Sequence, residues 1–191
     1  MKKIALATMA LVLMTSQYGC ANPQNGYRGA KISQTTTTLS QVQLNDLLFM
    51  YEEEKVARDV YSVLAQHWNV RVFSNITQSE QRHMDAIKTI LDRYGVKVNV
   101  SDGLGSFTIP ELNQAYLELT QKGALSLKDA LEVGVAIEKM DIADLEKRIP
   151  TASNDTKVVF QNLLDASYKH LNAFERNLAN GGMGGMRQGR R

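Results

Sequence analysis

The segment SEQRHM, at residues 79–84, contains a glutamate and a histidine three positions apart, Glu80 and His83. In a helix such side chains are neighbours, with Cβ atoms about 5–6 Å apart, so a single metal ion can bind both. Both also lie on the apolar row of the helical pattern over residues 72–94. The alternative is a capping box, in which Glu80 returns to the backbone amide of Thr77. Apolar residues continue upstream of Thr77, which favours an interior position for Glu80.

Three consecutive glutamates, Glu52, Glu53 and Glu54, lie in an earlier helical pattern. The centre of its apolar stripe lies between the directions of Glu53 and Glu54, whereas Glu52 points well away from it. Periodicity therefore leaves Glu53 and Glu54 as equal candidates for an inward-facing carboxylate. Taken alone, the run is better interpreted as a solvated acidic face.

Two later helical patterns also carry polar residues on their apolar rows. Glu138 lies on the row of residues 131–145, and Asp141 follows it by three, where the spacing fits a ligand and a surface residue equally. His170 lies on the row of residues 163–174, where a histidine by itself is more often a core residue. Because an unpaired buried carboxylate is costly, polar candidates on all four inner faces together predict convergence on one or two metal ions.

Four long helices must position these residues. Apolar residues recur at three- and four-residue spacing over residues 44–68 and 72–94, which predicts a helical hairpin. A third helix is expected to begin after a Ser126 cap and to run to about residue 149. A fourth is expected from residues 153–155 to the glycine at position 181.

A long connection over residues 95–125 joins the two helix pairs. It contains a short extended run at residues 96–100 and a minor helix, which Thr108 and Pro110 open and Gly123 closes. Two hairpins joined by one long crossover predict an all-α fold, a ferritin-like four-helix bundle with the crossover between its second and third helices.

Residues 1–21 have the pattern of an export signal, with two lysines followed by an apolar run at residues 4–14. Gly19 before Cys20 fits a bacterial lipoprotein signal, in which Cys20 carries the lipid. Gly19 and Ala21, in a small-x-small pattern, also allow ordinary cleavage before Asn22. Both routes predict an exported protein, in the bacterial periplasm or anchored to the membrane as a lipoprotein.

The composition of the rest of the chain predicts one folded domain at residues 39–180. A flexible tether is expected before it, at residues 22–38, and a disordered Gly, Met and Arg tail after it, at residues 181–191. The 191 residues include 22 basic and 20 acidic side chains, so no global field favours nucleic acid or an acidic membrane. Membrane contact is expected only through a lipid anchor. The single cysteine excludes an intramolecular disulfide.

Several of these segments resemble proteins of the ferritin-like superfamily. EEEKVARDVY at residues 52–61 is similar to the first-helix ligand segment of rubrerythrins, and this similarity selects Glu54 over Glu53. SEQRHM matches the Glu-x-x-His of the superfamily's second helix. Together with AIEKMDI and ASYKHLNAF, these segments most closely resemble the family called domain of unknown function 2202, over residues 39–178.

The resemblance implies a carboxylate-bridged di-iron centre. The ligands that it carries over are Glu54, Glu80, His83, Glu138 and His170. Rubrerythrins also have a glutamate three residues before the last histidine, but here that position is Ser167, which supplies no carboxylate. Asp141 can replace this charge from the third helix; otherwise the site is asymmetric or holds one ion.

Such a ligand set suits iron, manganese or zinc. With iron, it predicts ferroxidase or peroxidase-like activity on dioxygen or peroxide. Glu80 and Glu138 are expected to bridge, Glu54 and His83 to hold one ion, and His170, with or without Asp141, to hold the other. No rubredoxin-like cysteine module is present, so the electron donor is a separate, unidentified molecule.

Two alternatives need no redox chemistry. One is a metal-binding or storage bundle, with Met183 and Met186 adding copper contacts. The other is a metal-free bundle whose buried carboxylates pair with Arg58 or Arg82. Tyr61 or Tyr51 can line the site, but apolar packing is the favoured role for each. A homodimer is compatible with the sequence.

Overall fold

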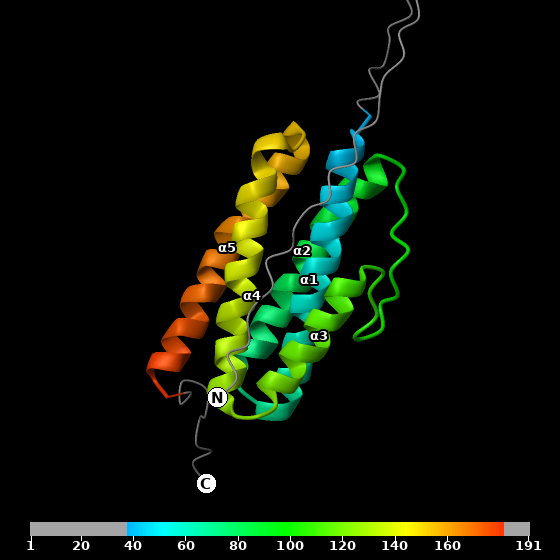
Figure 1. The fold of residues 1–191 in the computed structure, drawn as a ribbon. Helices are drawn as coiled ribbons and strands as arrows, with labels where there is room; N and C mark the ends of the chain where they lie inside the picture. The colour runs from blue at the N-terminus through cyan, green and yellow to red at the C-terminus, as the bar shows by residue number, and fades with distance from the viewer. Residues whose placement is uncertain (1–37, 182–191) are drawn as a thin grey trace, which may run out of the picture. The chain divides into compact units, whose positions relative to one another are not determined.

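The computed structural model describes residues 38–181, and this part of the chain is all-helical (Figure 1), which confirms the predicted all-α class. Its elements are α1 (Gln41–Trp68), α2 (Arg71–Arg93), α3 (Pro110–Gly123), α4 (Leu127–Arg148), the short 3-10 helix η1 (Ile149–Thr151) and α5 (Asn154–Ala179). None of the described helices is both long and apolar enough to span a membrane. The predicted export signal with Cys20, nearly all of the tether and the methionine-containing tail lie outside the described residues.

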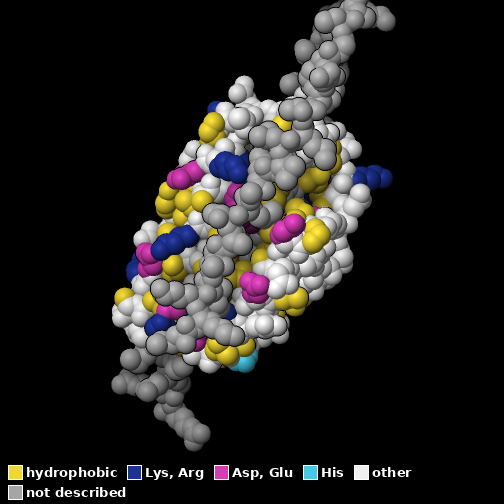
Figure 2. All heavy atoms as spheres, in the orientation of Figure 1, with side chains coloured by type: hydrophobic (Ala, Val, Ile, Leu, Met, Phe, Trp, Pro, Cys, Tyr) yellow, Lys and Arg dark blue, Asp and Glu magenta, His cyan; other side chains and the backbone are white. Residues whose placement is uncertain are grey.

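The four long helices lie side by side (Figure 1). α1 packs along α2, and α4 packs along α5, while contacts between α2 and α5 and between α1 and α4 join the two pairs. The connection after α2 brings α3 against both α1 and α4. On the face seen in Figure 2, acidic and basic side chains are interspersed over the described helices.

Capping residues place the helix ends close to their predicted positions. Ser40 and Gln43 form a capping box at the start of α1. Ser126 accepts a hydrogen bond from the Asp129 amide and opens α4, as predicted. α1 ends at Asn69, whose φ of 49° is left-handed and turns the chain toward α2.

The capping interpretation of Glu80 is wrong. α2 begins at Arg71, so Thr77 and Glu80 both lie inside the helix. The Thr77 hydroxyl donates to the carbonyl of Phe73 at 2.9 Å instead of capping an amide. Glu80 therefore projects from the middle of α2, where neighbouring side chains, and not an amide at the helix end, must compensate its charge.

The connection between α2 and α3 is irregular, and residues 96–100 form no strand. α3 begins at Pro110, as predicted, because a proline fits the first helical position, where its missing N–H costs nothing. Thr108 does not cap this helix. The cap is Ile109, and Thr108 instead donates from both its amide and its hydroxyl to the carboxylate of Glu52.

The apolar core consists of two clusters. One contains Val60, Phe73 and Phe174 among its fully buried members, and the other contains Met50 and Ile87. Along each long helix, the residues of one cluster are followed by buried polar residues and then by residues of the other cluster. The helices therefore enclose a polar layer between two apolar ones.

A glycine allows α4 and α5 to approach closely beside this layer. A Cβ atom at Gly134 would lie 2.5 Å from ring atoms of Phe174. Phe174 in turn packs against Tyr61, with ring centroids 5.1 Å apart. Any larger residue at position 134 must therefore displace an aromatic ring from the wall of the polar layer.

Candidate metal centre

The polar layer is almost completely removed from solvent. Its carboxylates have exposed fractions of 7% for Glu53, 2% for Glu54, 2% for Glu80, 2% for Glu138 and 6% for Asp141. The interpretation of residues 52–54 as a solvated acidic run is wrong, because Glu52 is also buried, at 3%. The surface interpretation of Asp141 is wrong for the same reason.

One group in the layer joins α1 to α2. The His83 Nδ1 atom lies 3.1 Å from Glu54 Oε2 and 2.7 Å from Glu80 Oε2. Ligand atoms from these three residues all lie within 4.8 Å of one another, close enough for a single metal ion.

A second group joins α2 to α4 and α5. The His170 Nδ1 atom lies 3.0 Å from Glu80 Oε1 and 3.5 Å from Glu138 Oε2, and the three residues again have ligand atoms within 4.8 Å of one another. The contact with Glu80 lacks the direction of a hydrogen bond, so it is a contact between charges. The imidazole rings of His83 and His170 stack with centroids 5.6 Å apart.

Glu80 alone belongs to both groups. Its Oε2 atom faces His83 and its Oε1 atom faces His170. Glu138, which we expected to bridge as well, belongs only to the second group. Glu54 lies in the first group, whereas Glu53 lies in neither.

Buried charges in the layer hold one another ionised. Burial opposes the charge of Glu80, but the imidazoles of His170 and His83 outweigh it and lower the pKa of this carboxyl to about 2. Burial likewise opposes a charged His83, yet Glu54 and Glu80 raise its pKa to about 11. Glu138 and Glu80 raise the pKa of His170 to about 9 against the same opposition.

The other carboxylates are short of positive charge. Burial raises the pKa of Glu138 and the pKa of Asp141 to about 7 each, and holds the pKa of Glu54 well above its ordinary value. Oxygen atoms of Glu53, Glu54 and Asp141 are buried without any hydrogen-bond partner in the described residues. An unpartnered buried carboxylate oxygen is costly. One or more cations would therefore stabilise these carboxylates better than the hydrogen-bond donors of the described residues do.

Without metal, the protein is expected to be most stable between about pH 4 and 4.5 and to lose stability as the pH rises. Folding raises the pKa of Glu138 and Asp141 to about 7 and the pKa of the two histidines to about 9 and 11, so the folded state binds more protons than the unfolded state from about pH 4.5 upward. Below that pH, the lowered pKa of Glu80 reverses the sign. Urea unfolding in the presence of a chelator at pH 5, 7 and 9 measures this dependence.

The double variant Glu138→Gln, Asp141→Asn is the control for this prediction. It should flatten the fall between pH 5 and 7 and reduce the fall above pH 7 without abolishing it, because His170 loses the Glu138 carboxylate whereas His83 keeps Glu54 and Glu80. A stability maximum near pH 8 in the parent would contradict the predicted proton uptake.

Ser167 occupies the position at which rubrerythrins have a glutamate. It is 1% exposed, and its hydroxyl contacts Asp141 Oδ2. The carboxylate of α4 therefore lies directly beside the α5 position that lacks one. Asp141 is not part of either three-residue group, although its Oδ1 atom is buried and unpartnered.

Tyr61 both packs in the apolar core and contacts the layer, so the site-lining role that the sequence left open for it is formed. Its hydroxyl donates to Glu138 Oε1 at 2.7 Å, and burial followed by the neighbouring charge of Glu138 raises its pKa well above the ordinary value. Tyr51 is buried in the apolar cluster that contains Met50, as expected.

Arg58 does not neutralise the layer. Its guanidinium pairs with Asp59 and Gln81. The Arg58 pairing assumed for a metal-free bundle is therefore not formed.

The sequence interpretation missed three buried charged residues on the other side of α1. Lys55 forms an ion pair with Asp59 at 2.6 Å and donates to the carbonyl of Gly103 at 2.7 Å. Asp59 also accepts a hydrogen bond from the amide of Gly105 at 3.0 Å, and Glu52 holds the residues before α3. Their spacing of three, four and seven residues puts them on one helix face, which is the signal that could have identified them.

The sequence of this helical domain matches a known protein family. The DUF2202 family, described as an uncharacterized protein domain, matches residues 43–187. The chain belongs to the DUF2202 family. The family predicted from the four helical segments is thereby confirmed.

Two solved structures are similar to this DUF2202 chain. Uncharacterized protein MJ0754 of Methanocaldococcus jannaschii is 45% identical over 146 residues, which are 75% of this chain and 79% of that protein. A crystal structure of this hypothetical protein superposes with a TM-score of 0.74 at 43% identity, over 78% of this chain and 87% of the other. A DUF305 fragment from Deinococcus radiodurans is only 12% identical but has a TM-score of 0.60, over 75% of this chain and 99% of the fragment, and it shares the fold alone.

Proposed function

We propose that this DUF2202 chain is a ferritin-like metal protein whose polar layer holds two iron ions. The observation that carries the proposal is the position of Glu80, which presents one oxygen to each of two buried groups of three ligands. A carboxylate shared between two imidazole-containing groups is an arrangement that can hold two metal ions. Manganese and zinc suit the same ligand types.

The chain's connectivity supports a ferritin-like four-helix bundle. α1 pairs with α2 and α4 pairs with α5, and the long connection with its minor helix α3 lies between the two pairs. The rubrerythrin-like pattern around Glu54 agrees with this arrangement, because Glu54 and Tyr61 both face the polar layer.

Each position in the layer has its own ligands. Glu54 and His83 would hold one ion, Glu138 and His170 the other, and Glu80 would contact both. Asp141, beside Ser167, would supply the negative charge that the fifth helix lacks. Tyr61 orients Glu138 through its hydrogen bond of 2.7 Å, which leaves the second Glu138 oxygen to face His170.

Iron held by these residues would supply one-electron redox chemistry. Reduction of one hydrogen peroxide with two protons to two water molecules would take one electron from each of two Fe(II) ions. The carboxylates of the layer favour the ferric state by charge. Electrons for another cycle come from an unidentified donor. The activity that we propose is therefore that of a ferroxidase or a peroxidase.

The predicted export signal places this activity in the cell envelope. Cleavage before Cys20 would yield a lipoprotein anchored to the membrane, and cleavage before Asn22 would yield a periplasmic protein. The proposed partners are dioxygen or peroxide, with neither nucleic acid nor a membrane surface involved beyond the anchor. A homodimer is compatible with the proposal.

Metal analysis of the purified protein tests this function. The parent is expected to contain iron or manganese at one to two ions per chain, and the Glu80→Ala, His83→Ala double variant is expected to lose it. Oxidation of added Fe(II) by peroxide or dioxygen, followed by absorbance, then separates a redox centre from passive storage. A parent protein that binds no metal and is equally stable with and without a chelator would contradict the proposal.

A further inference from the structure

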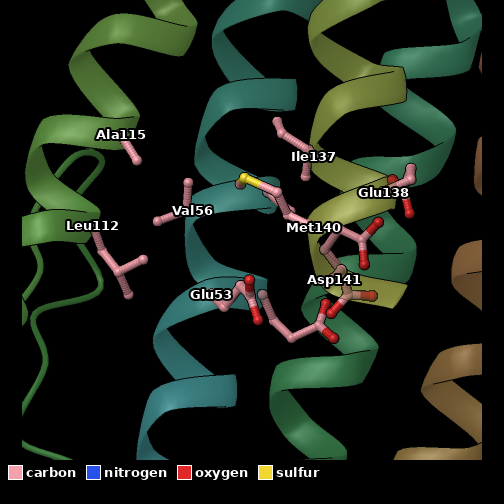
Figure 3. Close-up of a pocket in the computed structure, with 11 residues that line it drawn as sticks. Glu53, Val56, Leu112, Ala115, Ile137, Glu138, Met140 and Asp141 are labelled. Carbon is pink, nitrogen blue, oxygen red and sulfur yellow. The ribbon is translucent and has the colours of Figure 1, made fainter. Parts of the chain in front are cut away.

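A small pocket reaches the polar layer from the side of α3 (Figure 3). It is lined by Glu53, Glu54, Val56, Ala57, Glu80, Leu112, Ala115, Ile137, Glu138, Met140 and Asp141. Only about 20 Å³ is available to the centre of a water-sized molecule. That space accommodates one or two non-hydrogen atoms, which is too small for an organic substrate.

The two ends of the pocket differ in polarity. Leu112 and Ala115 of α3 lie across the pocket from Glu138 and Asp141 of α4, and Val56 lies between them (Figure 3). The end toward α3 is therefore apolar, and the other end is formed by carboxylates. A hydrated cation would lose its water shell against the apolar end without replacement, whereas a small uncharged molecule loses almost nothing there.

The wall formed by α3 is held at both ends. Before its first turn, the amides of Thr108 and Ile109 donate to Glu52 at 2.7 and 3.2 Å. At its last residue, the carbonyl of Gly123 accepts a hydrogen bond from the indole of Trp68 at 2.8 Å. α1 thus fixes both ends of the helix that closes the pocket, so the size of the opening is set by side chains of α3.

We propose that this pocket binds dioxygen and admits it to the carboxylate layer, and that Leu112 and Ala115 set the size limit that excludes organic hydroperoxides. The functional role of this binding rests on the proposed function, because dioxygen in the pocket is useful only next to a metal. The binding itself depends only on the shape and polarity of the pocket.

Relaxation of methyl groups by dissolved dioxygen tests the binding without any metal. In the full chain, saturated with a chelator, dioxygen is expected to speed the relaxation of the methyl groups of Val56, Leu112 and Ala115 more than that of the fully buried core residues Leu47 and Leu91. Ala115→Phe should fill the pocket and abolish the difference. Ala124→Phe, which adds the same bulk at the exposed end of α3, should leave it unchanged.

Equal relaxation at pocket and core methyl groups would overturn the inference, as would a difference that persists in Ala115→Phe. Ala115→Leu provides a smaller change of the same kind if the phenylalanine variant does not fold. Since no metal takes part, a negative metal analysis would contradict the proposed function and leave this result standing.

Rates with bound Fe(II) test the size limit. With dioxygen, two Fe(II) ions, one dioxygen and two protons yield two Fe(III) ions and one hydrogen peroxide. Ala115→Phe is expected to slow this oxidation several-fold at unchanged metal content, and Leu112→Ala is expected to speed oxidation by tert-butyl hydroperoxide. Rates that do not change with either substitution would refute the role of α3.

Discussion

Glu80→Ala is expected to remove metal from both positions of the layer, whereas His170→Ala should remove it from one. Glu80 is the only residue with an oxygen in each group, at 2.7 Å from His83 and 3.0 Å from His170. Loss of a residue that only supports a ligand weakens metal binding by about 10- to 100-fold, so loss of a shared ligand should exceed about 100-fold. Titration with Fe(II) or Zn(II), followed by metal analysis after dialysis, measures both stoichiometries.

Two exposed residues supply matched controls. His67→Ala and Glu118→Ala remove the same residue types from positions that face solvent, and neither should change the metal content. Helix content from circular dichroism checks that each variant is folded. Equal metal loss in Glu80→Ala and His170→Ala would contradict two positions that share one carboxylate and would favour a single ion.

Asp59→Ala is expected to cost about 3–5 kcal/mol of the free energy of unfolding, because it leaves the buried ammonium of Lys55 without its carboxylate. Both side chains of this pair are almost fully buried, at 1% and 0% exposure. The substitution also removes the acceptor of the Gly105 amide, which holds the connection before α3. Urea unfolding measures the cost, and hydrogen exchange of the Gly105 amide reports the loosened connection.

The chain contains its own control for this substitution. Lys88 and Asp92 form a pair of the same residue types at the same helical spacing, but with exposed fractions of 49% and 56%. Asp92→Ala should therefore leave stability unchanged within error, because solvent screens an exposed pair. Lys55→Met should cost less than Asp59→Ala, since Asp59 keeps its bonds to Arg58 and Gly105. Equal effects of Asp59→Ala and Asp92→Ala would show that burial does not govern the pair.

Much of the helical framework could be predicted from local sequence. Residues such as Ser126 and Pro110 mark helix starts through contacts within a few residues, so their effect is visible without the fold. The same reasoning located the inner-face positions of Glu80 and His170, because a helix has a fixed period. Thr108 was misassigned as a cap because its partner, Glu52, lies far away in the chain.

Periodicity also has a limit within one helix. It could not separate Glu53 from Glu54, since their directions lie on either side of the apolar stripe. The structure buries both and brings only Glu54 within reach of His83. The distinction depends on where α2 lies relative to α1, which is a property of packing.

Local sequence was enough to predict the all-α class of the domain that the structure describes, its membership of DUF2202, and the inward-facing positions of Glu80, His83, Glu138 and His170. These follow from helical period and residue type, which are local. Local sequence could not predict that Glu80 is shared by two groups, that Asp141 lies beside Ser167, or that Lys55 and Asp59 are buried under the connection. The physical reason is that each of these depends on how separate helices and the connection pack, and on the burial of charge that results from that packing.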